Sequence, residues 1–128
     1  MGVSNAFLRL GVVALIVGVG LGMWMGANED FTLRPIHAHI NLVGWASMMI
    51  MGFFYRLMPH TTGRLAWVQF GVFSVGFVLM ITGLTALLLG NQALLPALLA
   101  GELLTGLGIL LFAVILFRAT GGREAAPA

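Results

Sequence analysis

Long apolar runs without formal charge constrain the fold of this chain more than any other feature of its sequence. Residues 10–28 and 35–55 contain no charged side chain, and between Leu65 and Phe117 the only formal charge is Glu102. A helix that crosses a membrane needs about 20 apolar residues, and its main-chain groups must be hydrogen-bonded within the segment. The runs therefore predict membrane-spanning helices.

Four spans fit into these runs, and we expect an all-α membrane protein with helices at about 6–27, 35–58, 65–89 and 96–117. The last charge-poor run is too long for one span, and Gly90, Asn91, Gln92 and Pro96 supply a break within it. Pro35 falls in the first turn of the second helix, where proline is tolerated. The small and polar residues 118–128 predict a flexible tail.

The composition excludes several classes of protein. Charged residues make up 8% of the chain and hydrophobic residues 60%, whereas a soluble domain carries about 25% charged residues. A soluble enzyme, a nucleic-acid binder and a disordered protein are therefore excluded. All six cations are arginines, and they are too scattered to form a basic stripe for nucleic acid. The absence of cysteine excludes disulfides and thiolate metal sites.

The arginines also predict the orientation of the chain. With four spans, one side carries Arg34 beside Glu29 and Asp30, and the other side carries Arg9, Arg56, Arg64, Arg118 and Arg123. Because cytoplasmic loops are enriched in arginine and lysine, we expect cytoplasmic termini in a bacterial inner (cytoplasmic) membrane. An N-terminal signal peptide is the alternative for the first span, but Met25 is not the small residue that cleavage requires.

Small residues recur at helical spacing in two of the spans. Gly18, Gly22 and Gly26 lie on the first helix, and Gly101, Thr105 and Gly108 lie on the fourth. Such residues let helices approach each other closely in lipid. An alternative interpretation is that a flat cofactor lies against a surface without side chains, and the pattern alone leaves both open.

Polar and sulfur-containing side chains gather in the predicted external half. His37 and His39 lie in the first turns of the second helix, and Met23 and Met25 end the first helix at the same level. Glu102 lies about two turns into the fourth helix, near 9 Å from its start. Polar groups inside a span are costly and by default functional. We therefore expect residues from three helices to meet in one layer.

The two histidines of this layer point to nearly opposite faces, because residues two apart on a helix are turned by about 200°. Below His37 on its face comes Gly44, which leaves a flat gap where a ring can lie along the helix. This favours His37 as a cofactor ligand, with His39 facing another helix or subunit. The alternative is that both histidines bond loop carbonyls at the membrane surface.

Glu102 and His60 are two further ionisable residues with candidate roles in a site or at a helix contact. An unpaired Glu102 carboxyl is expected to be protonated, or to bond His39 or the hydroxyls of Thr82 and Thr85. Its alternative role is that of a lone acid at a helix contact. His60 follows Pro59 in the opposite loop, roughly 34 Å along a helix from His37, so it belongs to no site with His37.

The string Arg34-Pro35-Ile36-His37-Ala38-His39-Ile40-Asn41, running on to Gly52, Tyr55 and Pro59, resembles helix two of subunit I in the heme–copper oxidase superfamily. The nearest resemblance is to nitric oxide reductases and high-affinity terminal oxidases. In that family an R-P-x-H start carries the axial histidine of the low-spin heme. The resemblance covers about 25 residues and implies that His37 ligates a heme b.

The chain departs from the family pattern at the reactive centre. Its three histidines are too few for the family's catalytic metal and second heme, so the resemblance implies no oxidase chemistry. The family's subunit I consists of three similar four-helix arcs, and this chain resembles one arc. By analogy we expect a homo-oligomer, either a trimer or a dimer. The sixth iron ligand is then Met23, Met25, water or a histidine of a neighbour.

Three functions follow as hypotheses. The first is a b-type heme protein for electron transfer with a redox partner, or for sensing a diatomic gas. In it His37 ligates the iron, His39 is a second ligand or a supporting group, and Arg34 pairs with the heme propionates. The second is a copper or other transition-metal protein using ligands among His37, His39, Glu102, Asp30, Met23 and Met25. The third is a cofactor-free structural or assembly subunit.

Overall fold

The computed structural model describes residues 1–122, which are helical wherever they form regular structure and include no strand. Four helices of this part are long and apolar enough to cross a membrane, which confirms the predicted all-α membrane class. They are α1 (Val3–Asn28), a composite second helix (Arg34–Leu57), α4 (Arg64–Leu88) and α5 (Leu95–Thr120).

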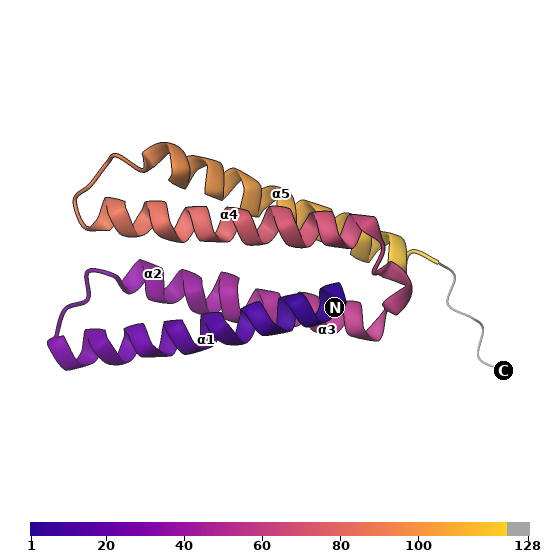
Figure 1. The fold of residues 1–128 in the computed structure, drawn as a ribbon, viewed down its shortest axis with the longest axis horizontal. Coiled ribbons are helices and arrows are strands. Elements are labelled where there is room, and N and C mark those ends of the chain that lie inside the picture. The colour runs from indigo at the N-terminus through magenta and orange to yellow at the C-terminus, as the bar shows by residue number, and fades with distance from the viewer. Residues whose placement is uncertain (123–128) are drawn as a thin grey trace.

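The composite helix has three parts of different geometry. It runs through α2 (Arg34–His39), η1 (Ile40–Ala46) and α3 (Ser47–Leu57), and a short 3-10 turn, η2 (Pro59–Thr61), follows it. The four long helices form two hairpins that lie side by side along the long axis of the molecule (Figure 1). The N-terminus and the end of α5 lie at the same end of the molecule, because the chain runs along this axis four times.

The helix boundaries follow local chemistry. Pro35 and Pro96 lie in the first turns of α2 and α5, where a missing N–H costs nothing. Gly90 has φ +86° after the end of α4, a left-handed conformation that favours glycine. The last helix continues to Thr120, so residues 118–120 are helical rather than part of the predicted tail. The remainder of that predicted tail, from residue 123 on, lies outside the described residues.

The α4–α5 hairpin is held by direct approach of one main chain to the other. A β-carbon placed on Gly76 would lie 2.5 Å from the main-chain nitrogen of Thr105, and one on Gly83 would lie 2.6 Å from that of Leu98. A β-carbon on Gly101 would overlap the main-chain nitrogen of Met80. Real atoms cannot come this close. Close helix packing is therefore what the small residues of α5 provide.

Aromatic rings make several of the contacts between the two hairpins. The ring of Phe7 on α1 lies edge-on to Phe70 of α4 at 4.9 Å between centroids. The ring of Phe54 on α3 lies edge-on to Phe112 of α5 at 5.1 Å. Edge-to-face pairs of this kind add to the dispersion gained on packing. Bulky side chains thus keep the hairpins further apart than the helices within α4–α5.

One fully buried polar side chain also crosses this interface. The Tyr55 hydroxyl donates a hydrogen bond of 3.1 Å to Oε1 of Gln69, and Nε2 of Gln69 donates one of 3.1 Å to the Gly108 carbonyl. Gln69 has no exposed surface. Because a polar group in an apolar interior is costly unless it is bonded, this amide is stable only while α3, α4 and α5 remain together.

The second helix is not the regular helix that the sequence predicts. Residues Ile40–Ala46 form a π-helix, which begins one residue after His39. Two side chains bond carbonyls along it: Asn41 donates to His37 at 2.8 Å, and Ser47 donates to Leu42 at 2.8 Å. Both carbonyls also accept a main-chain N–H, that of Ile40 for His37 and that of Ser47 for Leu42, so the side-chain bonds add to those of the helix. Segments of π-helix occur frequently at functional sites.

Candidate cofactor-binding site

His37 lies on α2 with its imidazole packed against α1, and it is partly buried. Its ring occupies the space where Gly22 has no side chain, since a β-carbon on Gly22 would lie 2.8 Å from Cε1 of His37. Nδ1 lies 2.8 Å from the main-chain carbonyl of Gly18. Two glycines of α1 therefore fix the position of this ring, one through its missing side chain and one through its carbonyl oxygen.

The contact with Gly18 assigns the tautomer of His37. A carbonyl oxygen only accepts, so the 2.8 Å contact places a proton on Nδ1, and in the neutral imidazole Nε2 then carries the lone pair. Nδ2 of Asn41 is 3.4 Å from Nδ1 but only 2.8 Å from the His37 carbonyl. The shorter bond is the one that Asn41 makes, so it does not compete for Nδ1. Metal-binding histidines commonly donate their second ring nitrogen to a carbonyl in this way.

His39 faces a different neighbour from His37. Its Nδ1 lies 2.7 Å from the Pro35 carbonyl of its own helix. The same reasoning leaves Nε2 of His39 with its lone pair. The two imidazoles thus have different surroundings: that of His37 packs against α1, whereas that of the half-buried His39 bonds a carbonyl of its own helix.

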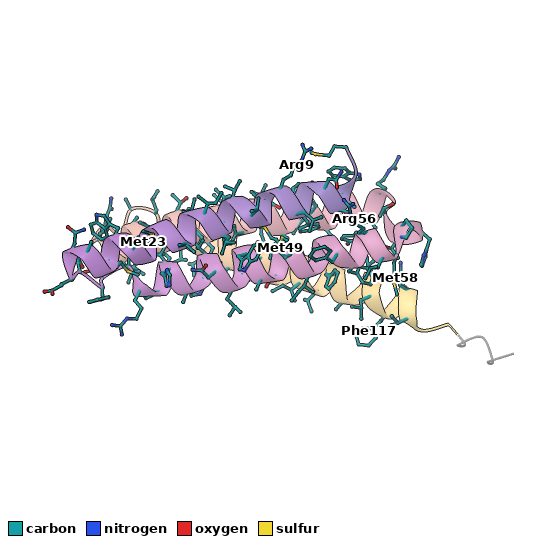
Figure 2. The ribbon with its side chains drawn as sticks, turned by 90° about the horizontal axis from the view of Figure 1, so that it is seen from below. Arg9, Met23, Met49, Arg56, Met58 and Phe117 are labelled. Atoms are coloured by element: carbon teal, nitrogen blue, oxygen red, sulfur yellow. The ribbon has the colours of Figure 1, made fainter. Side chains whose placement is uncertain are left out.

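The remaining residues predicted at this end are split between the interior and the surface. Met25 is buried with 4% of its surface exposed, whereas Met23, in the last turns of α1, is 71% exposed (Figure 2). Arg34 is exposed, and its guanidinium lies 5.5 Å from the centroid of the Phe31 ring. In the adjoining loop, hydrogen bonds from the Thr32 hydroxyl and main-chain N–H lower the pKa of Asp30 below its usual value.

The flat gap expected at Gly44 is filled. A β-carbon on Gly44 would lie 2.8 Å from Cβ of Ala14 and 2.8 Å from Cζ of Phe77. Gly44 therefore brings the second helix against α1 and α4, and a cofactor ring has no space against it in this arrangement. Nor do the glycines of α1 form a continuous flat face. Gly18 is covered by Asn41 and Gly22 by His37, while Gly26 has open space.

The expected partners of Glu102 are also not beside it. Glu102 is exposed on α5. The hydroxyls of Thr82 and Thr85 instead donate to carbonyls of their own helix, Val78 and Ile81, at 2.8 and 2.7 Å. Helix packing buries Gly101 and Thr105 and so turns the neighbouring Glu102 outward.

Among residues 1–122, no three histidine or acidic side chains lie close enough together to hold a metal ion. His60 lies in η2, in the connection between the two hairpins, far along the chain from His37. Of the predicted site residues, His37 and His39 therefore remain candidate ligands. They suit a metal that is already held by an organic ring and needs only one or two ligands from the protein.

Two features of this site were not recognised in the sequence. The Gly18 carbonyl as partner of His37 follows from a main-chain atom, which no residue type encodes. The π-helix after His39 has no composition of its own. The available signal was the four-residue spacing shared by Gly18 and Gly22 on one helix and by His37 and Asn41 on the other. These two pairs lie against each other, Gly18 with Asn41 and Gly22 with His37.

Comparison of the chain with protein-family models, with curated proteins and with solved structures yields no match.

Proposed function

We propose that this chain is a membrane b-type heme protein in which Nε2 of His37 is an axial ligand of the iron. The observation that carries the proposal is the 2.8 Å contact between Nδ1 of His37 and the Gly18 carbonyl, which orients the ring and leaves Nε2 free to coordinate. The R-P-x-H resemblance to helix two of heme–copper oxidases supports the same residue. A bound heme supplies one-electron redox chemistry or a coordination position for a diatomic gas.

The residues present fit one side of such a heme. His37 provides the ligand atom, and the exposed guanidinium of Arg34 is three residues away, so it is free to bond propionates at the membrane surface. The fit is incomplete within one copy. A cavity between α1 and α4 is lined by Ile40 and Phe77, and another lies at the opposite end beside His60, but neither wall includes His37 or His39.

A second copy of the chain would complete the site in this proposal. His39 is half-buried and bonds the Pro35 carbonyl through Nδ1, and Met23 on α1 is 71% exposed. In this proposal one of these side chains is the second axial ligand of an iron held by a neighbouring copy. The proposal therefore includes a homo-oligomer, a dimer or trimer, with cytoplasmic termini in a bacterial inner membrane and a redox partner on the external side.

The test is the absorption spectrum of purified protein loaded with heme b, in oxidised and reduced forms and with carbon monoxide. We expect a Soret band that His37→Ala abolishes, while His60→Ala, which removes the histidine at the other end, leaves it unchanged. If His37→Ala retains the full spectrum, or if the wild-type protein takes up no heme, the proposal fails. Helix content by circular dichroism confirms that both variants are folded.

A further inference from the structure

A cavity of about 280 Å³ opens at the end of the molecule opposite His37. Its wall combines the η2 turn, the start of α4 and the end of α5, and the lining residues are His60, Thr61, Leu65, Ile115, Arg118 and Ala119. The cavity therefore lies where the connection between the two hairpins meets the last helix. This is the level at which apolar spans give way to a membrane surface.

This end of the molecule carries positive charge without acidic compensation among the described residues. Four arginines belong to it, and Figure 2 shows two of them, Arg9 and Arg56, at the end opposite Met23. The three acidic residues within 1–122 lie elsewhere, Glu29 and Asp30 in the loop after α1 and Glu102 in the first turns of α5. An anion is therefore attracted to this end.

The arginine of the cavity is available to such an anion. Arg56 is already engaged, since it donates to Asn5 and to the Ser4 hydroxyl. Arg118 is exposed and makes no hydrogen bond or ion pair with the described part of the chain. His60 is exposed beside it. The Thr61 hydroxyl donates to Met58 at 2.7 Å, so its proton is not free for a ligand. Arg118 and His60 are thus the donors that the cavity offers.

The rest of the wall is apolar. Leu65 and Ile115 line the cavity, and Phe117, near the end of α5, has 72% of its surface exposed (Figure 2). A free inorganic anion uses only the polar part of such a wall. A phospholipid uses both parts, with its phosphate at the cationic side chains and its acyl chains along the apolar ones. Basic pockets between membrane helices are known to hold anionic headgroups.

We propose that this cavity binds the phosphate headgroup of an anionic phospholipid through Arg118 and His60. The site is independent of the heme proposal, because it lies at the other end of the molecule and shares no residue with it.

The experiment titrates delipidated protein in detergent with phosphatidylglycerol or with phosphatidylcholine and counts the bound lipids by native mass spectrometry. We expect preferential retention of phosphatidylglycerol. Arg118→Gln should weaken it about fivefold, since one basic residue near an anionic lipid contributes about 1 kcal/mol. Arg118→Lys, which keeps the charge, should retain most of the binding. Arg9→Gln is the matched control, because Arg9 lies at the same end but outside the cavity.

Several results would overturn the proposal. Equal retention of the two lipids would exclude an anion site, and equal effects of Arg118→Gln and Arg9→Gln would show general surface charge instead of a cavity. Displacement of phosphatidylglycerol by millimolar inorganic phosphate would show that the apolar wall contributes nothing. Should Arg118→Gln fail to fold, His60→Gln in the η2 turn provides the same test, with binding unchanged as the contradicting result.

Discussion

At the scale of single residues, glycines at helix contacts have two different tasks. Gly101 and Gly108 of α5 let one main chain touch another, whereas Gly18 and Gly22 of α1 make room for the polar side chains of Asn41 and His37. The difference matters because a flexible side chain can move away from an intruding methyl group and a main chain cannot. Substitutions at the two kinds of glycine should therefore have separable consequences.

We expect Gly22→Ala to damage the proposed heme site without unfolding the protein. The new β-carbon would lie 2.8 Å from Cε1 of His37, so the ring must turn and its bond to the Gly18 carbonyl is lost. Loss of such a supporting bond typically lowers metal affinity about 10–100-fold. Heme titration followed by absorption measures this effect. Gly20→Ala, where a β-carbon meets no atom within 4 Å, is the control, and equal affinities would contradict the expectation.

Glu102 provides a second test at this scale. Because the carboxyl lies on the outward face of α5 and not beside His37, Glu102→Gln should leave the spectrum of the heme-loaded protein unchanged. A shifted Soret band or altered carbon monoxide binding would show that Glu102 reaches the iron, from the same copy or from a neighbour.

At the scale of helices, the close contact between α4 and α5 depends on main-chain approach. Gly101→Ala should destabilise this hairpin by about 1–3 kcal/mol, because the methyl group meets the main chain of Met80, which has no rotamer to change. The midpoint of thermal unfolding in detergent reports the loss. On the same helix, Gly106→Ala meets open space and should be neutral or slightly stabilising through helix propensity. Identical midpoints for the two variants would refute this packing.

The sequence was sufficient to predict the four spans and the break between α4 and α5. Charge-free runs set the spans, and the positive φ of Gly90 and the first-turn positions of Pro35 and Pro96 have local causes that can be recognised from residue type. The sequence does not predict the π-helix, since no residue type in Ile40–Ala46 is specific to that geometry. Nor does it predict the extension of α5 to Thr120, because the charge of Arg118 ends the apolar run at Phe117.

The site was only partly accessible from the sequence. Spacing separated the directions of His37 and His39, but it could not show that Phe77 from a distant helix fills the space at Gly44. Nor could it show that Glu102 is turned outward by the glycine contacts of its own helix. Both depend on which face of one hairpin meets the other, a long-range arrangement that local patterns do not determine.

At the scale of the whole molecule, the bond between Tyr55 and Gln69 tests how the hairpins are joined. Each of Tyr55→Phe and Gln69→Leu should lower the free energy of unfolding, because each leaves a buried polar partner without its bond. The double variant should be more stable than the sum of the two losses predicts, by about 0.6 and at most roughly 1.7 kcal/mol, the range found for such bonds in membranes. Strict additivity in a double-mutant cycle would contradict the coupling.

The close main-chain contacts between α4 and α5 bear on whether the two hairpins can assemble from separate chains. Within α4–α5 the closest contacts join residues near each other in the chain, such as Gly83 and Leu98, whereas the ring pairs between the hairpins join residues far apart. We therefore expect each hairpin to form before the two hairpins pack, so that the covalent link at η2 is not needed for the architecture. Two separately translated halves, divided between Met58 and Gly63, should find each other in the bilayer and copurify.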